Sequence, residues 1–391
     1  MTQIKEDDHQ YIAPTYARFD VVLTHGKGAR VFDENEKEYI DMGAGIGVNA
    51  LGYANDEWVK AVSVQASALA HVSNLYYTKN DTLVAKKLCS LTHFKKMFFA
   101  NSGAEANEGA IKVARKYSFD KYGARRHEII TLINSFHGRS ITTLSATGQD
   151  HFHQYFDPFT PGFKYAIAND IQDIKAKMNE KTCAIMIELI QGEGGVIPLD
   201  KKYVKELAKL CKQQDILLIV DEVQTGIGRT GSLYAYERYD IQPDIVTTAK
   251  GLGNGLPIGG VLLGDKVEMT LGAGDHGTTF GGNPIACAGA NVVLSYMTEE
   301  LFEEVIKKGE YIRTRLLAMK HIVKVDGMGL MLGATCESVS AKSVVLACVD
   351  AGLLLLTAKD KIRFLPPLTI SMEELSQAMD ILENVLKEME A

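Results

Sequence analysis

Short apolar runs alternate with helical stretches through the middle of the chain. Residues 96–100 predict a strand, and residues 104–122 predict a helix because their apolar positions recur at helical spacing. Three short apolar runs, at residues 128–133, 184–188 and 216–221, predict further strands. Helical segments such as 203–213 lie between them. Short apolar strands separated by helices indicate a mostly parallel sheet that helices cover on both faces.

The two ends of the chain have a different pattern. Residues 21–32 predict a hairpin around a glycine turn. A long helix over 298–320 precedes short strands near 330–335 and 361–364, and a last helix follows Ser371, which has capping-box spacing.

This change of pattern predicts two domains in an α/β protein. A length of 391 residues is ample for more than one domain. We expect a large domain over residues 56–297. We expect a smaller α+β domain that combines an N-terminal segment, residues 1–55, with residues 298–391.

Composition narrows the class of protein. The net charge of -7 disfavours nucleic acid and anionic membranes as partners. No apolar run is long enough to span a bilayer, and the N-terminus lacks the apolar core of a signal peptide. The six cysteines form no C-x-x-C pair, which favours free thiols in the cytoplasm. His151 and His153 have no nearby ligand partner, so we expect no metal site.

Lys250 is the most informative residue. It follows the apolar run 244–248 and precedes three glycines, while Asp221 ends the run 216–221. A pyridoxal phosphate (PLP) enzyme needs this pair, because the lysine binds the cofactor as a Schiff base and the aspartate keeps the pyridine nitrogen protonated. Taken alone, Lys250 reads first as a solvated lysine, because lysines are mostly exposed, and Asp221 also reads as a capping residue; the PLP reading gains because the other motifs then have a role.

A phosphate site is predicted where the helix 104–122 begins. The free backbone N–H groups of a helix N-terminus favour an anion, and Gly103 allows close approach. A plain N-cap turn is the alternative reading. The loop 276–284, rich in glycine and threonine, also suits a phosphate, or else caps the helix that follows it.

Four more residues have a candidate role and an ordinary one. Phe136 can stack on a planar ring or pack in the core. Arg139 can bind a carboxylate in bidentate fashion or form a surface ion pair. Gln224 can contact a ring hydroxyl or lie in a surface loop. Arg363 lies in an apolar segment, so it needs an anionic partner, either a substrate or a structural acid.

Residues 226–231 match the dinucleotide pattern G-x-G-x-x-G and motivate a rival class, an NAD(P)-dependent oxidoreductase. The context is poor, because these glycines do not open a long helix and the next strand does not end in an acid. A third alternative is a non-catalytic binding protein with a PLP-enzyme fold, but such a protein would not need Lys250.

These blocks, in this order, resemble the class III (subgroup II) aminotransferases, which are fold type I PLP enzymes, and among them the acetylornithine aminotransferases. Residues 136–140 with 144–148 are particularly specific, and the similarity runs from residue 16 to residue 368. The resemblance implies PLP as cofactor and a homodimer with a shared active site. It also implies that small amino acids are the substrates.

The resemblance also implies roles for individual residues. In the cofactor site, the resemblance implies that Lys250 attaches PLP covalently and transfers the proton, and that Asp221 contacts the ring nitrogen. It implies that Gln224 contacts the ring hydroxyl and that Phe136 stacks on the ring. The phosphate is expected to be bound by Ser102, Gly103, Ala104 and the neighbouring subunit's Thr279. For the substrate, the resemblance implies that Arg363 binds the α-carboxylate and that Glu193 pairs with Arg363 during one half-reaction. It implies that Arg139 binds the side-chain carboxylate of glutamate and that Tyr16 contacts the carboxylate of an ornithine-type substrate. Glu188 is expected to be an acid that supports the site from behind these residues.

The expected reaction transfers the amino group of N2-acetyl-L-ornithine to 2-oxoglutarate, giving N-acetyl-L-glutamate 5-semialdehyde and L-glutamate, a step of arginine biosynthesis. Ornithine, succinylornithine and 4-aminobutyrate remain alternative donors, because two arginines suit several of them. The chain departs from the family pattern at residues 53–58 and at Asp326, which leaves the local loops and the substrate fit open.

Overall fold

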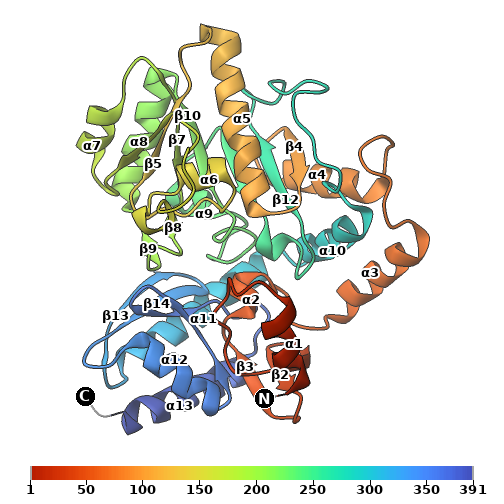
Figure 1. The fold of residues 1–391 in the computed structure, drawn as a ribbon, viewed down its shortest axis with the longest axis vertical. Helices are drawn as coiled ribbons and strands as arrows, with labels where there is room; N and C mark the ends of the chain where they lie inside the picture. Colours follow the sequence, from red (N-terminus) through yellow and green to blue (C-terminus); the bar gives the residue numbers. More distant parts are fainter. Residues whose placement is uncertain (1, 390–391) are drawn as a thin grey trace.

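A seven-stranded sheet forms the centre of the larger part of this computed structural model, which describes residues 2–389 (Figure 1). Residues 1, 390 and 391, at the ends of the predicted segments 1–55 and 298–391, lie outside the described residues. The strands in spatial order are β4 (Lys96–Ala100), β12 (Gly259–Leu263), β11 (Ile245–Thr248), β10 (Leu217–Asp221), β7 (Thr182–Ile187), β5 (Glu128–Leu132) and β6 (Phe163–Ala166).

The expectation of a mostly parallel sheet is confirmed. Strands β11, β10, β7, β5 and β6 are parallel neighbours, and only β12, among the strands of this sheet, runs antiparallel to its partners β11 and β4. Because β12 is antiparallel to both β11 and β4, β4 runs in the same direction as the five parallel strands. The carboxyl ends of β4, β11, β10, β7 and β5 therefore meet at one edge, where α/β proteins commonly bind their ligands.

Helices cover both faces of this sheet. Along β10, Leu217 and Ile219 belong to one apolar cluster, which includes the helix α5, while Leu218 and Val220 belong to another, which includes α8. Successive side chains of a strand point to opposite faces, so both faces are buried. The helices of this part are α3 (Asp56–Ala68), α4 (Lys79–Leu91), α5 (Gly103–Tyr122), α6 (Ile141–Ala146), α7 (Ile171–Lys177), α8 (Lys201–Gln214), α9 (Ala235–Tyr239) and α10 (Pro284–Ser295).

The smaller part joins both ends of the chain. One sheet has the order β1 (Leu23–Lys27), β2 (Arg30–Asp33), β3 (Glu38–Asp41) and β15 (Leu353–Leu354), so the C-terminal strand β15 pairs with β3, which in turn pairs with the N-terminal hairpin. A second sheet has the order β13 (Ile322–Met328), β14 (Met331–Cys336), β17 (Lys361–Phe364) and β16 (Leu356–Ala358). The domain boundaries after residues 55 and 297 stay a prediction.

Three helices pack with these sheets: α11 (Glu299–Leu317), α12 (Ala341–Asp350) and α13 (Met372–Glu388). The predicted capping box is present, since Ser371 and Glu374 each accept a hydrogen bond from the other's backbone N–H. A two-stranded hairpin, β8 (Ile190–Gln191) with β9 (Ile197–Pro198), and two 3-10 turns, Asp150–Phe152 and Lys250–Leu252, complete the larger part.

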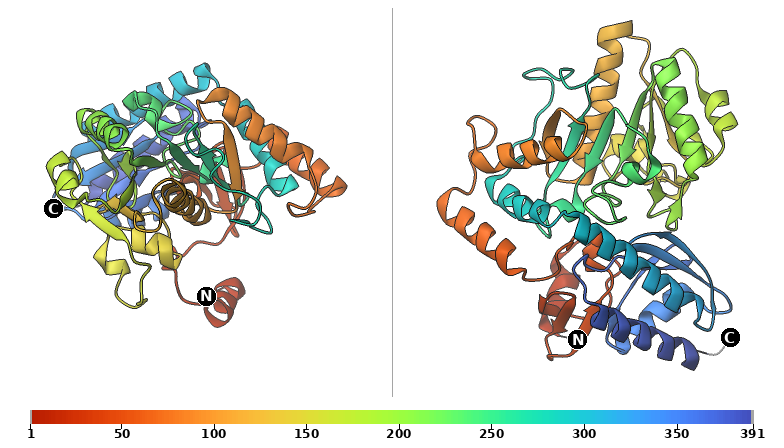
Figure 2. Two further views of the ribbon diagram at one scale, coloured as in Figure 1. Left: turned by 90° about the horizontal axis from the view of Figure 1, so that it is seen from above. Right: turned by 180° about the vertical axis from the view of Figure 1, so that it is seen from behind.

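The N-terminal helix α1 (Gln3–Tyr11) projects from the body of the molecule, as the left view of Figure 2 shows. None of its residues is buried. No helix within residues 2–389 combines the length and the apolar character that a membrane crossing requires.

The short element α2 (Ala44–Gly47) is a left-handed turn, with φ values of 46° at Ala44, 62° at Gly45, 63° at Ile46 and 73° at Gly47. Such a conformation is costly for a β-branched residue such as Ile46. The turn leads directly to Val48, which lines a cavity at the carboxyl ends of the sheet strands that is described below. Backbone strain of this kind concentrates at functional sites.

Candidate active site

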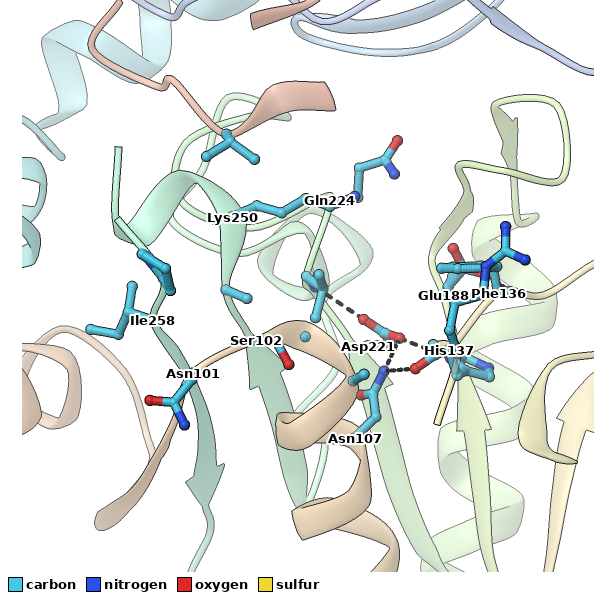
Figure 3. A pocket seen from close by; sticks show the side chains of 18 of the residues that line it. Asn101, Ser102, Asn107, Phe136, His137, Glu188, Asp221, Gln224, Lys250 and Ile258 are labelled. Carbon is cyan, nitrogen blue, oxygen red and sulfur yellow. Dashed lines mark hydrogen bonds and ion pairs between the residues drawn. The ribbon is translucent and has the colours of Figure 1, made fainter. Parts of the chain in front are cut away.

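The main cavity lies at the sheet edge where five strands end, and its volume is about 410 Å³ (Figure 3). It brings together most of the predicted cofactor residues. The lining includes Ser102, Gly103, Ala104, Phe136, Arg139, Glu188, Asp221, Gln224 and Lys250, which come from five separate segments of the chain.

The N-terminus of α5 faces this cavity. The Ser102 side chain caps the helix by accepting the backbone N–H of Glu105, at 3.2 Å. A Cβ atom at Gly103 would lie 2.6 Å from Cγ1 of Val223, so only glycine fits there without a shift. The segment is therefore an N-cap turn, as the ordinary reading required, and its first free N–H groups suit an anion; the phosphate role stays a prediction.

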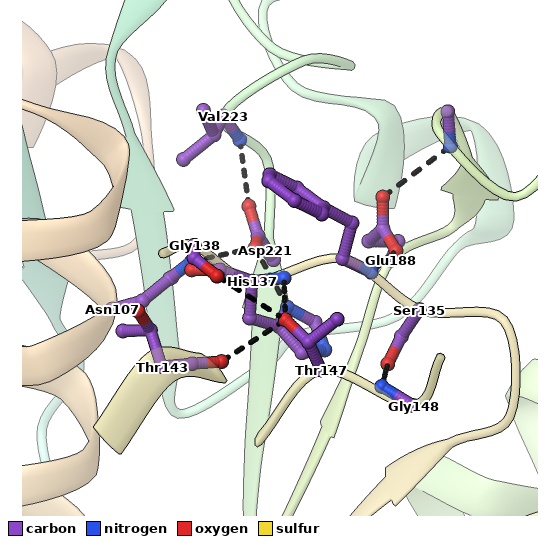
Figure 4. Close-up of polar contacts among 12 residues, drawn as sticks. Asn107, Ser135, His137, Gly138, Thr143, Thr147, Gly148, Glu188, Asp221 and Val223 are labelled. Carbon is purple, nitrogen blue, oxygen red and sulfur yellow. Dashed lines mark hydrogen bonds and ion pairs between the residues drawn. The ribbon is translucent and has the colours of Figure 1, made fainter. Parts of the chain in front are cut away.

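Asp221 is held at the floor of the cavity by three donors (Figure 4). Its Oδ2 accepts from Asn107 Nδ2 at 2.7 Å and from His137 Nδ1 at 2.8 Å, and its Oδ1 accepts the backbone N–H of Val223 at 3.0 Å. Only 5% of Asp221 is exposed, so these bonds keep the carboxylate in one orientation.

The sequence analysis missed Asn107 and His137. Asn107 lies one turn after Gly103 on the buried face of α5, where a polar side chain is unusual and needs a partner. His137 is buried beside Phe136, and its backbone N–H donates to Thr147 Oγ1 at 2.9 Å. The unused signal for Asn107 was a polar residue at an apolar helical position.

Glu188 is a second buried carboxyl of the cavity. Its Oε2 accepts the backbone N–H of Phe136 at 2.8 Å, and its Oε1 accepts that of Gly192 at 3.3 Å. Burial, together with the charge of Asp221, raises its pKa well above the ordinary value. Glu188 therefore holds the loop that carries Phe136, and burial beside Asp221 disfavours its charged form.

Lys250 combines a strained backbone with a perturbed amine. Its φ of 44° is rare for a residue other than glycine. Burial lowers its pKa to about 8, against the opposing effect of Glu193 and Asp221. A larger fraction of Lys250 is thus neutral near pH 7 than of an ordinary lysine, which suits a nucleophile and a proton acceptor.

Gln224 stands between the cavity and an ion pair. Its Oε1 is buried without a hydrogen-bond partner among the described residues, while its Nε2 donates to Glu193 Oε1 at 3.5 Å. A buried acceptor that lacks a protein donor suits a ligand hydroxyl. Glu193 in turn pairs with Arg363.

Arg363 lies on β17 and is 3% exposed. Burial raises the pKa of Glu193, but the Arg363 guanidinium outweighs it and holds that pKa below the ordinary value. The acid partner that Arg363 requires is thus Glu193, and neither residue lines the cavity directly. Arg139, in contrast, does line it.

Besides Glu193 and Arg363, two more predicted site residues are absent from the lining of this cavity. Tyr16 is 75% exposed on the segment after α1, where its ring faces Arg18. Thr279 is exposed on the loop before α10, and its carbonyl oxygen accepts from Ser73 Oγ at 3.1 Å. Asn283 on that loop caps α10, as the alternative reading of the loop required.

The glycine pattern at residues 226–231 has a packing role. A Cβ atom at Gly231 would lie 2.4 Å from Cγ1 of Ile306 on α11, and Gly228 approaches Leu368. The next helix, α9, begins only at Ala235 and has five residues. The loop therefore lacks the long helix N-terminus of a dinucleotide site.

Both departures from the family pattern have structural partners. Asn55 caps α3, and Trp58 Nε1 donates to the carbonyl oxygen of Gly253 at 3.2 Å, just beyond Lys250. Asp326 pairs with Lys361 Nζ at 2.6 Å. Residues 53–58 thus support the turn that carries Lys250, and Asp326 neutralises a lysine on the strand of Arg363.

Comparison with known proteins agrees with this site. A family model described as aminotransferase class III matches residues 11–386. The acetylornithine aminotransferase of Haemophilus ducreyi is 53% identical over 389 residues, covering 99% of both chains. That of Methanocaldococcus jannaschii is 45% identical over 387 residues, covering 97% of both.

Solved structures give the same result. The N-acetylornithine aminotransferase of Stenotrophomonas maltophilia matches with a TM-score of 0.84 at 36% identity, covering 98% of both chains. The ornithine aminotransferase of Toxoplasma gondii, with PLP in partial occupancy at its active site, matches with a TM-score of 0.93 at 32% identity, covering 98% of this chain and 93% of that one. This chain therefore belongs to the class III aminotransferases, a family of PLP-dependent enzymes.

Proposed function

We propose that this aminotransferase uses N2-acetyl-L-ornithine as amino donor and 2-oxoglutarate as acceptor; several relatives that it resembles are named acetylornithine aminotransferases. One observation supports the chemistry above all: the amine of Lys250, the carboxylate of Asp221 and the N-terminus of α5 face a single cavity. The names of relatives 41–53% identical support the choice of donor.

The cavity fits PLP by its donor set. The free N–H groups at Gly103 and Ala104, with the Ser102 hydroxyl, suit the phosphate. Asp221 suits a protonated ring nitrogen, and the unpartnered Gln224 oxygen suits the ring hydroxyl. When bound, PLP supplies an electron sink for the pair released as a C–H bond breaks.

Lys250 supplies the covalent attachment and the proton transfer. With PLP bound, Nζ of Lys250 would serve as the base that takes a proton from the substrate carbon that carries nitrogen. Its pKa of about 8 makes Nζ an effective proton acceptor near neutral pH. Asn107 and His137 keep Asp221 in place throughout, because both donate to the same carboxylate oxygen.

Two arginines suit two different carboxylates. Arg139 offers its guanidinium to the distal carboxylate of glutamate or 2-oxoglutarate. Arg363 offers its own to the α-carboxylate of these substrates once Glu193 moves aside, and Tyr16 serves the carboxylate of the acetylornithine donor. Glu193 covers Arg363 while that donor is bound, so one cavity accepts two substrates of different charge.

Turnover with a panel of amines tests the choice of donor. We expect N2-acetyl-L-ornithine with 2-oxoglutarate to give the highest kcat/KM, ahead of ornithine, succinylornithine and 4-aminobutyrate. The assay would measure glutamate formation by the enzyme saturated with PLP. A higher kcat/KM for another donor would reassign the substrate within the class. No turnover with any donor would contradict the proposed function.

We also propose a cytoplasmic homodimer in which Thr279 reaches the phosphate of the partner's site. Ser73 and Asn74 donate to backbone carbonyls of the Thr279 loop, and the adjacent Leu75 and Tyr76 are 81% and 72% exposed. Exposed apolar side chains beside a functional loop favour a second copy as their cover.

A dimer predicts a mass of twice 42.9 kDa in analytical ultracentrifugation at the concentration of the assay. The variant Thr279→Ala should remain dimeric but bind PLP more weakly. A monomeric species with full activity would contradict the shared site.

A further inference from the structure

Arg139 and Arg363 are held in different ways. Arg363 is buried and paired with Glu193. Arg139 is exposed at the cavity, and within residues 2–389 its side chain makes neither an ion pair nor a hydrogen bond. A long, flexible side chain without polar partners would lose much rotamer freedom on binding a carboxylate. Another contact must therefore fix the orientation of the Arg139 guanidinium if this side chain is to bind a carboxylate efficiently.

Two aromatic rings provide that contact. The guanidinium carbon of Arg139 lies 4.2 Å from the ring centroid of Phe152 and 5.7 Å from that of Phe136. The two rings meet edge to face at 5.8 Å. Stacking covers a face of the guanidinium and leaves the N–H donors at its edge free, which is the geometry a carboxylate needs.

Phe152 is itself fixed to the loop that carries Phe136. Its backbone N–H donates to the carbonyl of Gln149 at 3.0 Å, within the 3-10 turn Asp150–Phe152. The buried Gln149 donates its Nε2 to the carbonyl of Ser135 at 3.1 Å. Ser135 precedes Phe136 directly, so Arg139 and both rings belong to one connected unit.

We propose that Phe152 is a positioning residue that holds the Arg139 guanidinium in place and thereby sets the preference for acceptors with a distal carboxylate. The inference rests on the proposed function for its substrate class. It assigns to Phe152 no contact with the cofactor and no part in proton transfer. Its effect should be confined to ligands that carry a second carboxylate.

The test compares three variants of the PLP-loaded enzyme. Phe152→Leu removes the π face but keeps an apolar side chain, and Phe152→Tyr restores the face. Phe156→Leu is the matched control, because Phe156 lies in the same loop region and its ring meets Tyr155 rather than Arg139. Calorimetry measures the binding of glutarate, a dicarboxylate without a reacting group, and of butyrate, which lacks the second carboxylate.

We expect Phe152→Leu to weaken glutarate binding, and to raise the KM for 2-oxoglutarate, roughly 3- to 30-fold, the range of one cation–π contact. Butyrate binding and the KM for the amino donor should stay unchanged. Phe152→Tyr and Phe156→Leu should resemble the wild type. The KM effect and its rescue by tyrosine separate positioning from a general loss of structure.

Two results would overturn the proposal. One is a glutarate affinity of Phe152→Leu equal to that of the wild type. The other is an equal loss for glutarate and butyrate, which would indicate a general disturbance of the cavity. Because glutarate binding needs no turnover, an enzyme inactive toward every amine would refute the proposed function and leave the calorimetric comparison to decide the role of Phe152.

Discussion

Lys250→Ala is expected to abolish transamination, with a loss of roughly 10³-fold or more, while the protein still folds. The variant loses both the group that attaches PLP and the base that moves the proton. No other lysine lines the cavity, among the residues that the structure describes, to replace it. Turnover and the visible absorption of the protein with added PLP are the measurements.

Stability separates this loss from misfolding. In the cofactor-free protein the pKa of Lys250 is about 8, below the value of an unfolded lysine. The folded state thus binds fewer protons between about pH 8 and pH 10.5, and below pH 8 the cost of the buried ammonium is present in full. Removing the amine should therefore not lower the unfolding midpoint at pH 7.

Lys60→Ala is a suitable control, because Lys60 is exposed on α3 and lies outside the cavity. It should keep full turnover and the absorption band of the wild type. Near-normal turnover of Lys250→Ala would refute the central role given to Lys250.

The fold was predictable where burial determines the pattern. Residues 96–100 and 361–364 form strands with the expected bounds: the first is apolar after Lys96, and the second places Ile362 and Phe364 in the core. The direction of β12 was not predictable, since its residues Gly259–Leu263 are apolar in either orientation. The left-handed turn at Ala44–Gly47 was missed too, because Ala44 and Ile46 give no local signal for positive φ.

The site was predictable only as far as strand ends and motifs reach. Lys250, Asp221 and Gly103 follow strands whose ends meet, so parallel topology alone brings them together. Asn107, His137 and Phe152 act through side-chain contacts across the fold, which spacing along the chain does not encode. Thr279 and Tyr16 lie outside the cavity, and their predicted roles depend on a partner subunit and on a bound substrate.

Asp221→Asn is expected to reduce turnover roughly 10²-fold or more, the scale on which one preorganised electrostatic contact acts. Asparagine has nearly the same shape, so the change removes the negative charge that favours a protonated ring nitrogen. In the wild type, Asn107 and His137 both donate to Oδ2 of Asp221. The amide oxygen of the asparagine can accept these two hydrogen bonds in its place. The variant should therefore fold and still bind PLP.

Glu188→Gln provides the matched control for this loss of charge. Glu188 is a neighbouring buried carboxyl whose pKa is raised well above its ordinary value by burial and by the charge of Asp221. Its replacement should cost much less turnover than Asp221→Asn, because burial already disfavours the charged form of Glu188 and the amide keeps a polar group at the loop that carries Phe136. Equal losses in the two variants would show that polar contacts, rather than the charge of Asp221, govern the reaction.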